Sequence, residues 1–150
     1  MRHCQLRTNQ RGAALVEFAL LLPFLIILLV IVAEMGRAIM TYDTLTRSVR
    51  DAARYLSMQA QDTGKTQARN LVVYGKTDPK AEEKVPVVPG LTLDEVDDPT
   101  WDPAGSAPAI ITVSIKVSGY SFTPMISSVF GLSIGPIPFN DIVATMRSQP

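Results

Sequence analysis

An apolar run near the N-terminus constrains this chain most. Residues 13–33 are 21 in number and contain one charged side chain, Glu17. A helix rises 1.5 Å per residue, so this run would be about 30 Å long, which matches the hydrocarbon thickness of a bilayer. The sequence therefore predicts one membrane-spanning helix over residues 13–33. Pro23 lies inside the run and should bend the helix, which spanning helices tolerate.

A cleavable secretory signal is the first alternative for this run. A basic segment with Arg2, Arg7 and Arg11 precedes it. Such signals usually have an apolar core of about 7 to 15 residues, and this run is longer and contains Glu17. We therefore expect the segment to stay in the protein. Because arginines also follow the run, at positions 37, 47, 50 and 54, the positive-inside rule leaves the orientation open.

Glu17 allows two interpretations. A carboxylate at the centre of a membrane helix costs about 2.5 to 3.5 kcal/mol, and less near an interface. Glu17 would lie only about 7 Å from the end of a helix that starts at Ala13, so it could be a tolerated interfacial side chain. The alternative is that the carboxylate of Glu17 pairs with a charged group outside the helix. The residues around Glu17 help to choose between these two interpretations.

The stretch around Glu17 reads "RGAALVEFALLLPF", residues 11–24. It resembles the N-termini of type IV pilin-like proteins, in which a prepilin peptidase cuts after a glycine and leaves a glutamate fifth in the mature chain. The resemblance implies a leader over residues 1–12 and cleavage between Gly12 and Ala13. It also implies that Glu17 and Phe18 take part in assembly. Cleavage would create a charged amine at Ala13, which is costly in an apolar core unless a carboxylate pairs with it.

The next segment, "EMGRAIMTYDTLTRSVRDAARYLS", narrows the resemblance. Together with the preceding run it is similar to the TadE-like family of the tight-adherence (Flp) pilus machinery, which opens with an "RGAAxVEFAL" segment and continues into "E-x-G-R" and an "A-A-R" helix. The later "ARNLVVYG" and "VPGLT" are also similar. The resemblance implies a structural minor pilin or pseudopilin that assists pilus assembly, adherence or secretion and is not an enzyme.

The same resemblance implies the location and the partners. It places the protein in the bacterial inner membrane as a single-pass protein, with a cytoplasmic N-terminus and a periplasmic head, and with incorporation into the pilus open. The implied partners are the prepilin peptidase, the main Flp pilin, other minor pilins and the assembly platform proteins. The alternative function is an uncleaved, membrane-anchored periplasmic binding module.

Residues 34–57 are predicted to continue the helix as an amphipathic segment. Met35, Tyr42, Val49 and Leu56 recur every seven residues, and Ala38, Ile39, Leu45, Ala52 and Ala53 fill the same stripe. The opposite face carries Asp43, Arg47 and Asp51 at four-residue steps. The stripe could pack on the protein's own head or against the helix of a neighbouring pilin.

The remaining residues, 58–150, are predicted to form a small α+β head. A short helix is expected from Thr66 to Tyr74, ended by Gly75, and residues 79–108 are rich in proline and predicted to be mostly loop. Residues 110–118 alternate apolar and polar side chains as a half-buried strand does. With segments near residues 96–101 and 140–148 it should form three antiparallel strands. The intervening residues 122–139 could cap the sheet or touch the bilayer surface. The predicted fold is thus pilin-like.

Composition excludes several chemistries. The only histidine and cysteine are His3 and Cys4, so the head lacks the usual zinc ligands and nucleophiles, and no disulfide forms within the chain. A formal net charge of zero gives no basic surface for nucleic acid. We expect no catalytic residue, no metal and no cofactor.

Two motifs in the head resemble ligand sites. Gly64, Lys65 and Thr66 mimic the end of a phosphate-binding loop, but Gln59 stands where that loop needs a glycine. The acidic stretch 94–102 could hold calcium, yet its spacing fits no calcium loop, which favours a solvated acidic edge.

Overall fold

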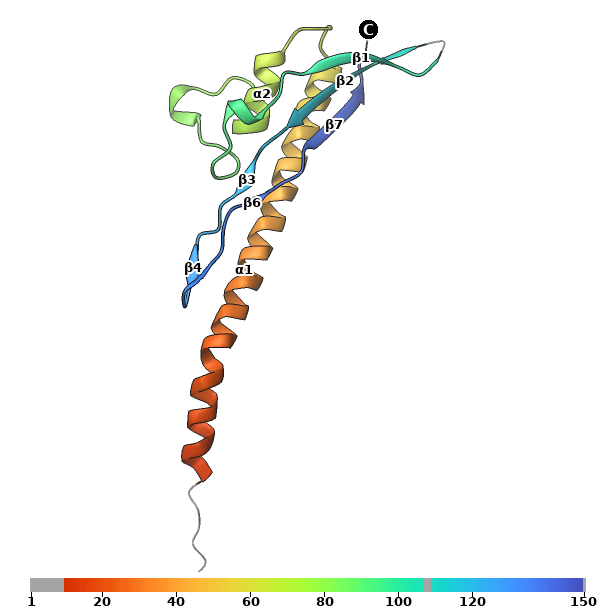
Figure 1. Cartoon of the computed structure of the whole chain (residues 1–150). Helices are drawn as coiled ribbons and strands as arrows, with labels where there is room; N and C mark the ends of the chain where they lie inside the picture. Colours follow the sequence, from red (N-terminus) through yellow and green to blue (C-terminus); the bar gives the residue numbers. More distant parts are fainter. Residues whose placement is uncertain (1–9, 107–108, 150) are drawn as a thin grey trace, which may run out of the picture.

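The computed structural model describes residues 10–106 and 109–149, with side chains from residue 12 onward. Its main element is a single helix, α1 (Gln10–Ser57), which is 48 residues long. Figure 1 shows this helix as the long axis of the molecule, with all other elements gathered around its C-terminal half. The two predicted helical segments, 13–33 and 34–57, are thus one helix, which continues through Pro23. The predicted fold class, α+β with a long N-terminal helix and a small antiparallel sheet, is confirmed.

The head contains one further α-helix and one three-stranded sheet. The helix is α2 (Lys65–Tyr74), and short 3-10 turns follow at Ala81–Glu83 and Leu93–Glu95. The strands are β1 (Thr100–Ala104), β2 (Ile110–Val117) and β7 (Ile142–Arg147). They are antiparallel in the order β1-β2-β7, so β2 is the central strand. The short helix predicted over 66–74 is confirmed, and Gly75 ends it in a left-handed conformation with φ 68°.

The predicted alternation of β2 is confirmed, since Val113, Ile115 and Val117 are buried. The position predicted for the first strand is wrong, because β1 begins at Thr100 and runs past Trp101 to Ala104. A 3-10 turn ends at Glu95, and Val96 then makes only an isolated bridge to Val117 before the chain reaches Pro99. β1 also contains Pro103, which an edge strand tolerates because one of its sides needs no hydrogen-bond donor.

The core lies between the C-terminal half of α1, α2 and the sheet (Figure 1). From α1 it takes Leu45, Val49, Ala52, Ala53 and Leu56, all fully buried. The apolar stripe predicted for residues 34–57 therefore packs on the protein's own head over this part. Met35 and Ile39 of the same stripe are 51% and 65% exposed, because the sheet does not extend to that level of the helix, so packing of a neighbouring helix there stays a prediction.

Between β2 and β7 the chain forms a two-stranded extension, residues 120–139, which we call the arm. Its strands are β3 (Ser121–Phe122), β4 (Ser128–Val129), β5 (Leu132–Ser133) and β6 (Ile137–Pro138). β3 pairs with β6 and β4 pairs with β5, both antiparallel. Figure 1 shows the arm extending from the sheet along α1, toward the N-terminal half of the helix, rather than folding over the sheet. The N-terminal half of α1 continues beyond the arm.

Candidate functional site: the exposed helix and its junction with the arm

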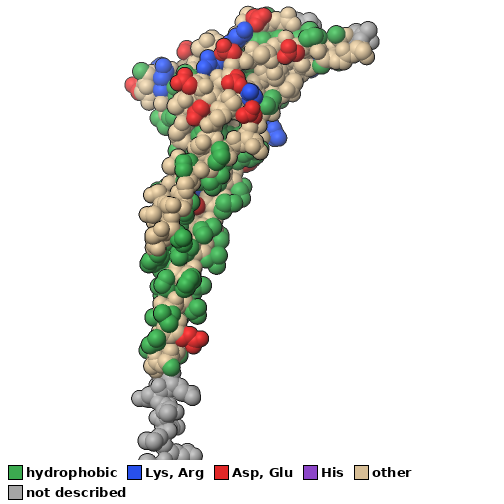
Figure 2. All heavy atoms as spheres, in the orientation of Figure 1, with side chains coloured by type: hydrophobic (Ala, Val, Ile, Leu, Met, Phe, Trp, Pro, Cys, Tyr) green, Lys and Arg blue, Asp and Glu red, His purple; other side chains and the backbone are tan. Residues whose placement is uncertain are grey.

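The N-terminal half of α1 exposes an apolar surface. In the described residues, one helix is long and apolar enough to cross a membrane, and its best 18-residue window has a mean hydropathy of 3.1, with none of that window buried inside the molecule. Leu20, Phe24 and Leu29 are 67% to 71% exposed. Figure 2 shows hydrophobic side chains around the lower column of the molecule, while lysines and arginines gather on the head. The helix therefore has the properties of a single-pass membrane anchor.

The predicted processing and assembly residues lie together at the start of α1. Gly12 and Ala13 are in the first turns of the helix, and both are exposed. Glu17 follows Ala13 by four positions, which places both on the same helix face one turn apart. Phe18 is 57% exposed. Among the residues whose side chains the structure describes, no hydrogen bond or ion pair involves Glu17.

A second polar group lies where the apolar run ends, at Glu34, and the sequence prediction missed it. Glu34 is 5% exposed although it is charged. Its Oε2 accepts a hydrogen bond from Nη1 of Arg37 at 2.8 Å, and its Oε1 accepts a longer one from the backbone N–H of Ile126 at 3.4 Å. The guanidinium of Arg37 lies 5.5 Å from the ring centre of Phe122. Glu34 and Arg37 therefore attach the arm to α1.

Aromatic rings complete this junction. Phe139, at the end of the arm, contacts the ring of Tyr42 edge-on with centroids 5.5 Å apart. The rings of Tyr120 and Phe122 lie 5.5 Å and 6.4 Å from Phe139 on the arm side. The Tyr120 hydroxyl donates to the carbonyl of Pro89 at 2.8 Å, and burial raises the pKa of that hydroxyl. The base of the arm is therefore fixed both to the helix and to the head.

These contacts give physical roles to motif residues quoted from the sequence, since Glu34 and Arg37 are the charged residues of "E-x-G-R". Residues 12–54 match the model of the TadE-like proteins. The matched segment is most of α1, under a third of the chain, and it contains Gly12, Glu17, Glu34 and Arg37. No curated protein and no solved structure matches the chain.

The TadE-like match indicates a protein associated with the tight-adherence pilus. The match ends within α1 at residue 54, so it covers the exposed helix and its junction with the arm but not the head.

Two carboxylates of the acidic stretch 94–102 form ion pairs with basic side chains of the head. Asp97 pairs with Lys116 at 2.9 Å and accepts from the Ser118 hydroxyl at 3.0 Å, and these contacts, the Lys116 bond first, lower the pKa of its carboxyl. Asp98 pairs with Arg69 at 3.1 Å. In the part of the chain that the structure describes, no group of three or more metal-ligating side chains is placed to hold an ion.

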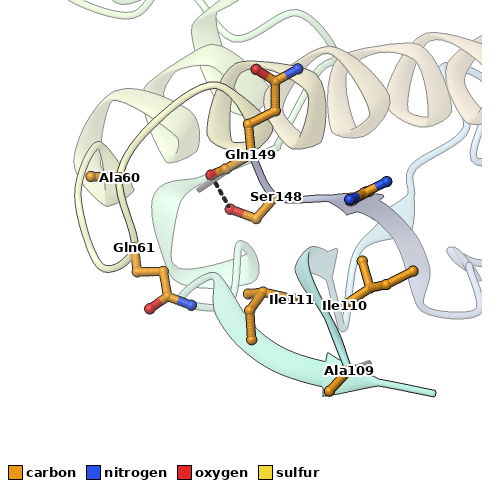
Figure 3. Close-up of a pocket in the computed structure, with 8 residues that line it drawn as sticks. Ala60, Gln61, Ala109, Ile110, Ile111, Ser148 and Gln149 are labelled. Atoms are coloured by element: carbon orange, nitrogen blue, oxygen red, sulfur yellow. Dashed lines mark hydrogen bonds between the residues drawn. The ribbon is translucent and has the colours of Figure 1, made fainter. Parts of the chain in front are cut away.

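A hollow lies at the opposite end of α1 from Glu17. It has a volume of about 530 Å³ and lies between the loop after α1, the start of β2 and the end of β7. Figure 3 shows the side chains of Ile110 and Ile111 on one wall and Gln149 and Ser148 on another. The Ser148 hydroxyl donates to the Gln149 carbonyl at 3.3 Å. This open, mostly apolar hollow brings together no nucleophile and base.

Proposed function

We propose that this TadE-like protein is a structural minor pilin or pseudopilin of a tight-adherence pilus, with no catalytic activity. It crosses the bacterial inner membrane once, with a cytoplasmic N-terminus and a periplasmic head. The prepilin peptidase removes residues 1–12. The mature protein then packs through α1 with the main Flp pilin and other minor pilins, together with the assembly platform proteins.

The observation that carries this proposal is the exposed apolar half of α1 with one carboxylate, that of Glu17, near its start. An apolar surface of this length is stable only in lipid or among other apolar helices. After cleavage, the amine of Ala13 would lie one turn from Glu17 along the same face. In a row of such helices with an axial offset of about one turn, Glu17 of each subunit can pair with the amine of the next, which favours assembly in register.

The head supports a structural role because it fixes the helix rather than forming a reaction site. Leu45, Val49 and Leu56 are fully buried against it, so the C-terminal half of α1 is rigidly held while the N-terminal half remains available. The head thus holds one half of α1, and the other half is exposed and can insert into lipid or pack against other helices. This arrangement suits a subunit whose contacts to neighbours run through the helix.

Intact-mass measurement of the protein extracted from membranes tests the processing step. We expect a mature chain that begins at Ala13, and a Gly12→Leu variant that stays at full length because the peptidase requires the glycine. Ala14→Leu is the matched control, since it adds the same side chain two positions later and should still be cleaved. A wild-type protein that retains residue 1 would instead favour the uncleaved, membrane-anchored binding module.

A further inference from the structure

We propose that the tip of the arm, residues 125–134, is a second membrane contact. It would lie in the headgroup and upper acyl region of the leaflet nearest the head, where phospholipid is its partner. The proposal rests on α1 spanning the bilayer, which is part of the proposed function, and adds a contact that the helix alone does not provide.

The arm has the composition of a membrane-interface segment. Between Lys116 and Asp141 the chain contains no charged residue. The apolar side chains of the tip face outward: Met125 is 77% exposed, Phe130 66% and Leu132 56%. Side chains of this kind are rarely exposed as a group on a protein surface that meets only water. The head, by contrast, carries lysines and arginines on its surface (Figure 2).

The position of the arm brings this tip to the membrane. The amide of Ile126, at the start of the tip, donates a hydrogen bond to Glu34. Glu34 is the first residue after the apolar run, so the tip begins at the level where that run ends. From there the chain continues toward the N-terminal half of α1, and Figure 1 shows β4 at the level of the orange part of that helix. Val30 and Ile27, one and two turns before Glu34, are half-buried, while the rest of the run except Pro23 is exposed. A bilayer that covers residues 13–33 therefore also reaches the tip.

The turn at the tip supports the same partner. Val129 pairs with Leu132, so Phe130 and Gly131 form a two-residue hairpin turn, and both have positive φ, 48° and 85°. The first position of such a turn favours asparagine or aspartate, because a bulky side chain is disfavoured in the left-handed region. Phe130 is thus unfavourable both for the backbone and for exposure to water. At a bilayer surface the exposure of the Phe130 ring becomes favourable, because aromatic rings partition into the interface.

Backbone hydrogen bonding limits how deep the tip can go. A two-stranded hairpin leaves N–H and C=O groups unpaired along its outer edges, and hydrocarbon cannot satisfy them. The tip also carries the hydroxyls of Ser127, Ser128 and Ser133, which suit a region that still contains water and headgroups. Both features place the arm at the interface and not at the bilayer centre.

Tryptophan fluorescence in nanodiscs tests this contact. The full chain with Trp101→Phe loses its only tryptophan, and single tryptophans are then introduced as Phe130→Trp or Leu132→Trp. Val85→Trp is the control in the head, where Val85 is 69% exposed, and Leu21→Trp is the control in the span. Each protein is reconstituted at one copy per disc with acyl-chain-brominated phosphatidylcholine, which quenches nearby indoles.

We expect brominated lipid to lower the emission of the two tip tryptophans and of Leu21→Trp at least twofold, and to leave Val85→Trp unchanged. Quenching of Leu21→Trp without quenching of either tip variant would overturn the arm contact and leave the span intact. If Leu21→Trp were also unquenched, the proposed span would fail with it. Tip emission that shifts to the blue only when several copies share a disc would assign the tip to a neighbouring subunit instead, which also contradicts the proposal.

Discussion

The backbone amide of Ile126 donates a hydrogen bond of 3.4 Å to the carboxylate of Glu34, across 92 positions in the sequence. The same carboxylate accepts from Arg37 at 2.8 Å, so it joins two segments with one buried group. Glu34 is the first residue after the apolar run, and the head begins to cover the helix there. The hydrogen bond therefore joins the arm to α1 at the level where the exposed apolar run ends.

Removal of this carboxylate should loosen the arm. Glu34→Ala leaves the Ile126 amide without its acceptor and Arg37 without its ion pair, which costs about 1 to 3 kcal/mol of local stability. We expect faster hydrogen exchange of the amides between residues 121 and 139, measured by mass spectrometry on the full chain in detergent. Asp43→Ala is the control, because its pair with Arg47 is exposed and worth about 0.3 to 0.5 kcal/mol. Equal exchange in the two variants would show that Glu34 does not hold the arm.

The packing of α1 on the head predicts a large effect at Leu45. Its side chain is fully buried, so Leu45→Ala should lower the free energy of unfolding of the head by about 2 to 5 kcal/mol. Trp101 packs against the same core, so its fluorescence during urea unfolding in detergent reports the change. Met40→Ala is the matched control on α1, since Met40 is 72% exposed. A similar loss in both variants would mean that the head does not depend on this helix face.

The sequence predicted those parts of the fold that rest on periodic patterns. The length of the apolar run, the seven-residue repeat around Val49 and the alternation along β2 each follow from local spacing, and the structure confirms them. The family resemblance also pointed correctly to the TadE-like match. The pairing of Glu17 with a neighbouring amine remains a prediction, because a single chain cannot form it.

The arm could not be predicted in the same way. Residues 120–139 have no sustained alternation, since three prolines and two glycines interrupt them, and their position depends on contacts far apart in the sequence. Met35 and Ile39 lie on the predicted apolar stripe, and the sequence alone left open which surface covers them. Their spacing matches that of Val49, but the sheet that would cover them ends higher along the helix.

The ion pair between Asp97 and Lys116 predicts acid sensitivity of the head. The Lys116 hydrogen bond holds the pKa of the Asp97 carboxyl below its ordinary value, about 3.9. The folded state therefore favours the charged form, and this contribution is present above the unfolded pKa and lost as the pH falls through the folded pKa. Because the pair is about two-fifths exposed, we expect less than about 1 kcal/mol.

Urea unfolding between about pH 5 and pH 3 measures this loss. Asp97→Asn should show a shallower fall in stability than the wild-type chain over this range. Asp94→Asn is the control, since it removes a carboxylate of the same stretch that forms no part of this ion pair. An unchanged slope in Asp97→Asn would show that the pair does not contribute.

The head should bind neither calcium nor ATP with micromolar affinity. Asp97 and Asp98 already pair with Lys116 and Arg69, so a cation would have to displace these partners. α2 follows a turn from α1 and not a strand, and Gln59 stands at the first glycine position of a phosphate-binding loop. Titration calorimetry with each ligand is the direct measurement. Micromolar binding of either would support the anchored binding module.

The assembly role of Glu17 separates a pilin from a passive anchor. If Glu17 pairs with the amine of Ala13 in a neighbouring subunit, Glu17→Gln keeps the shape of the side chain but leaves that amine uncompensated. The loss of one partner of a buried pair typically costs about 3 to 5 kcal/mol. If Glu17 is only an interfacial side chain, glutamine should insert equally well or better, because no charge is then held near lipid.

We therefore expect the Glu17→Gln protein to reach the membrane and still fail to support pili. Membrane fractionation measures insertion, and crosslinking to the main pilin together with counting of pili measures assembly. Asp43→Asn is the control, since it neutralises an exposed carboxylate on the same helix outside the apolar run and should leave assembly intact. If the pairing exists, the amine of Ala13 lacks its partner in the Glu17→Gln strain and assembly must weaken. Normal pili and normal crosslinks in that strain would therefore refute the pairing.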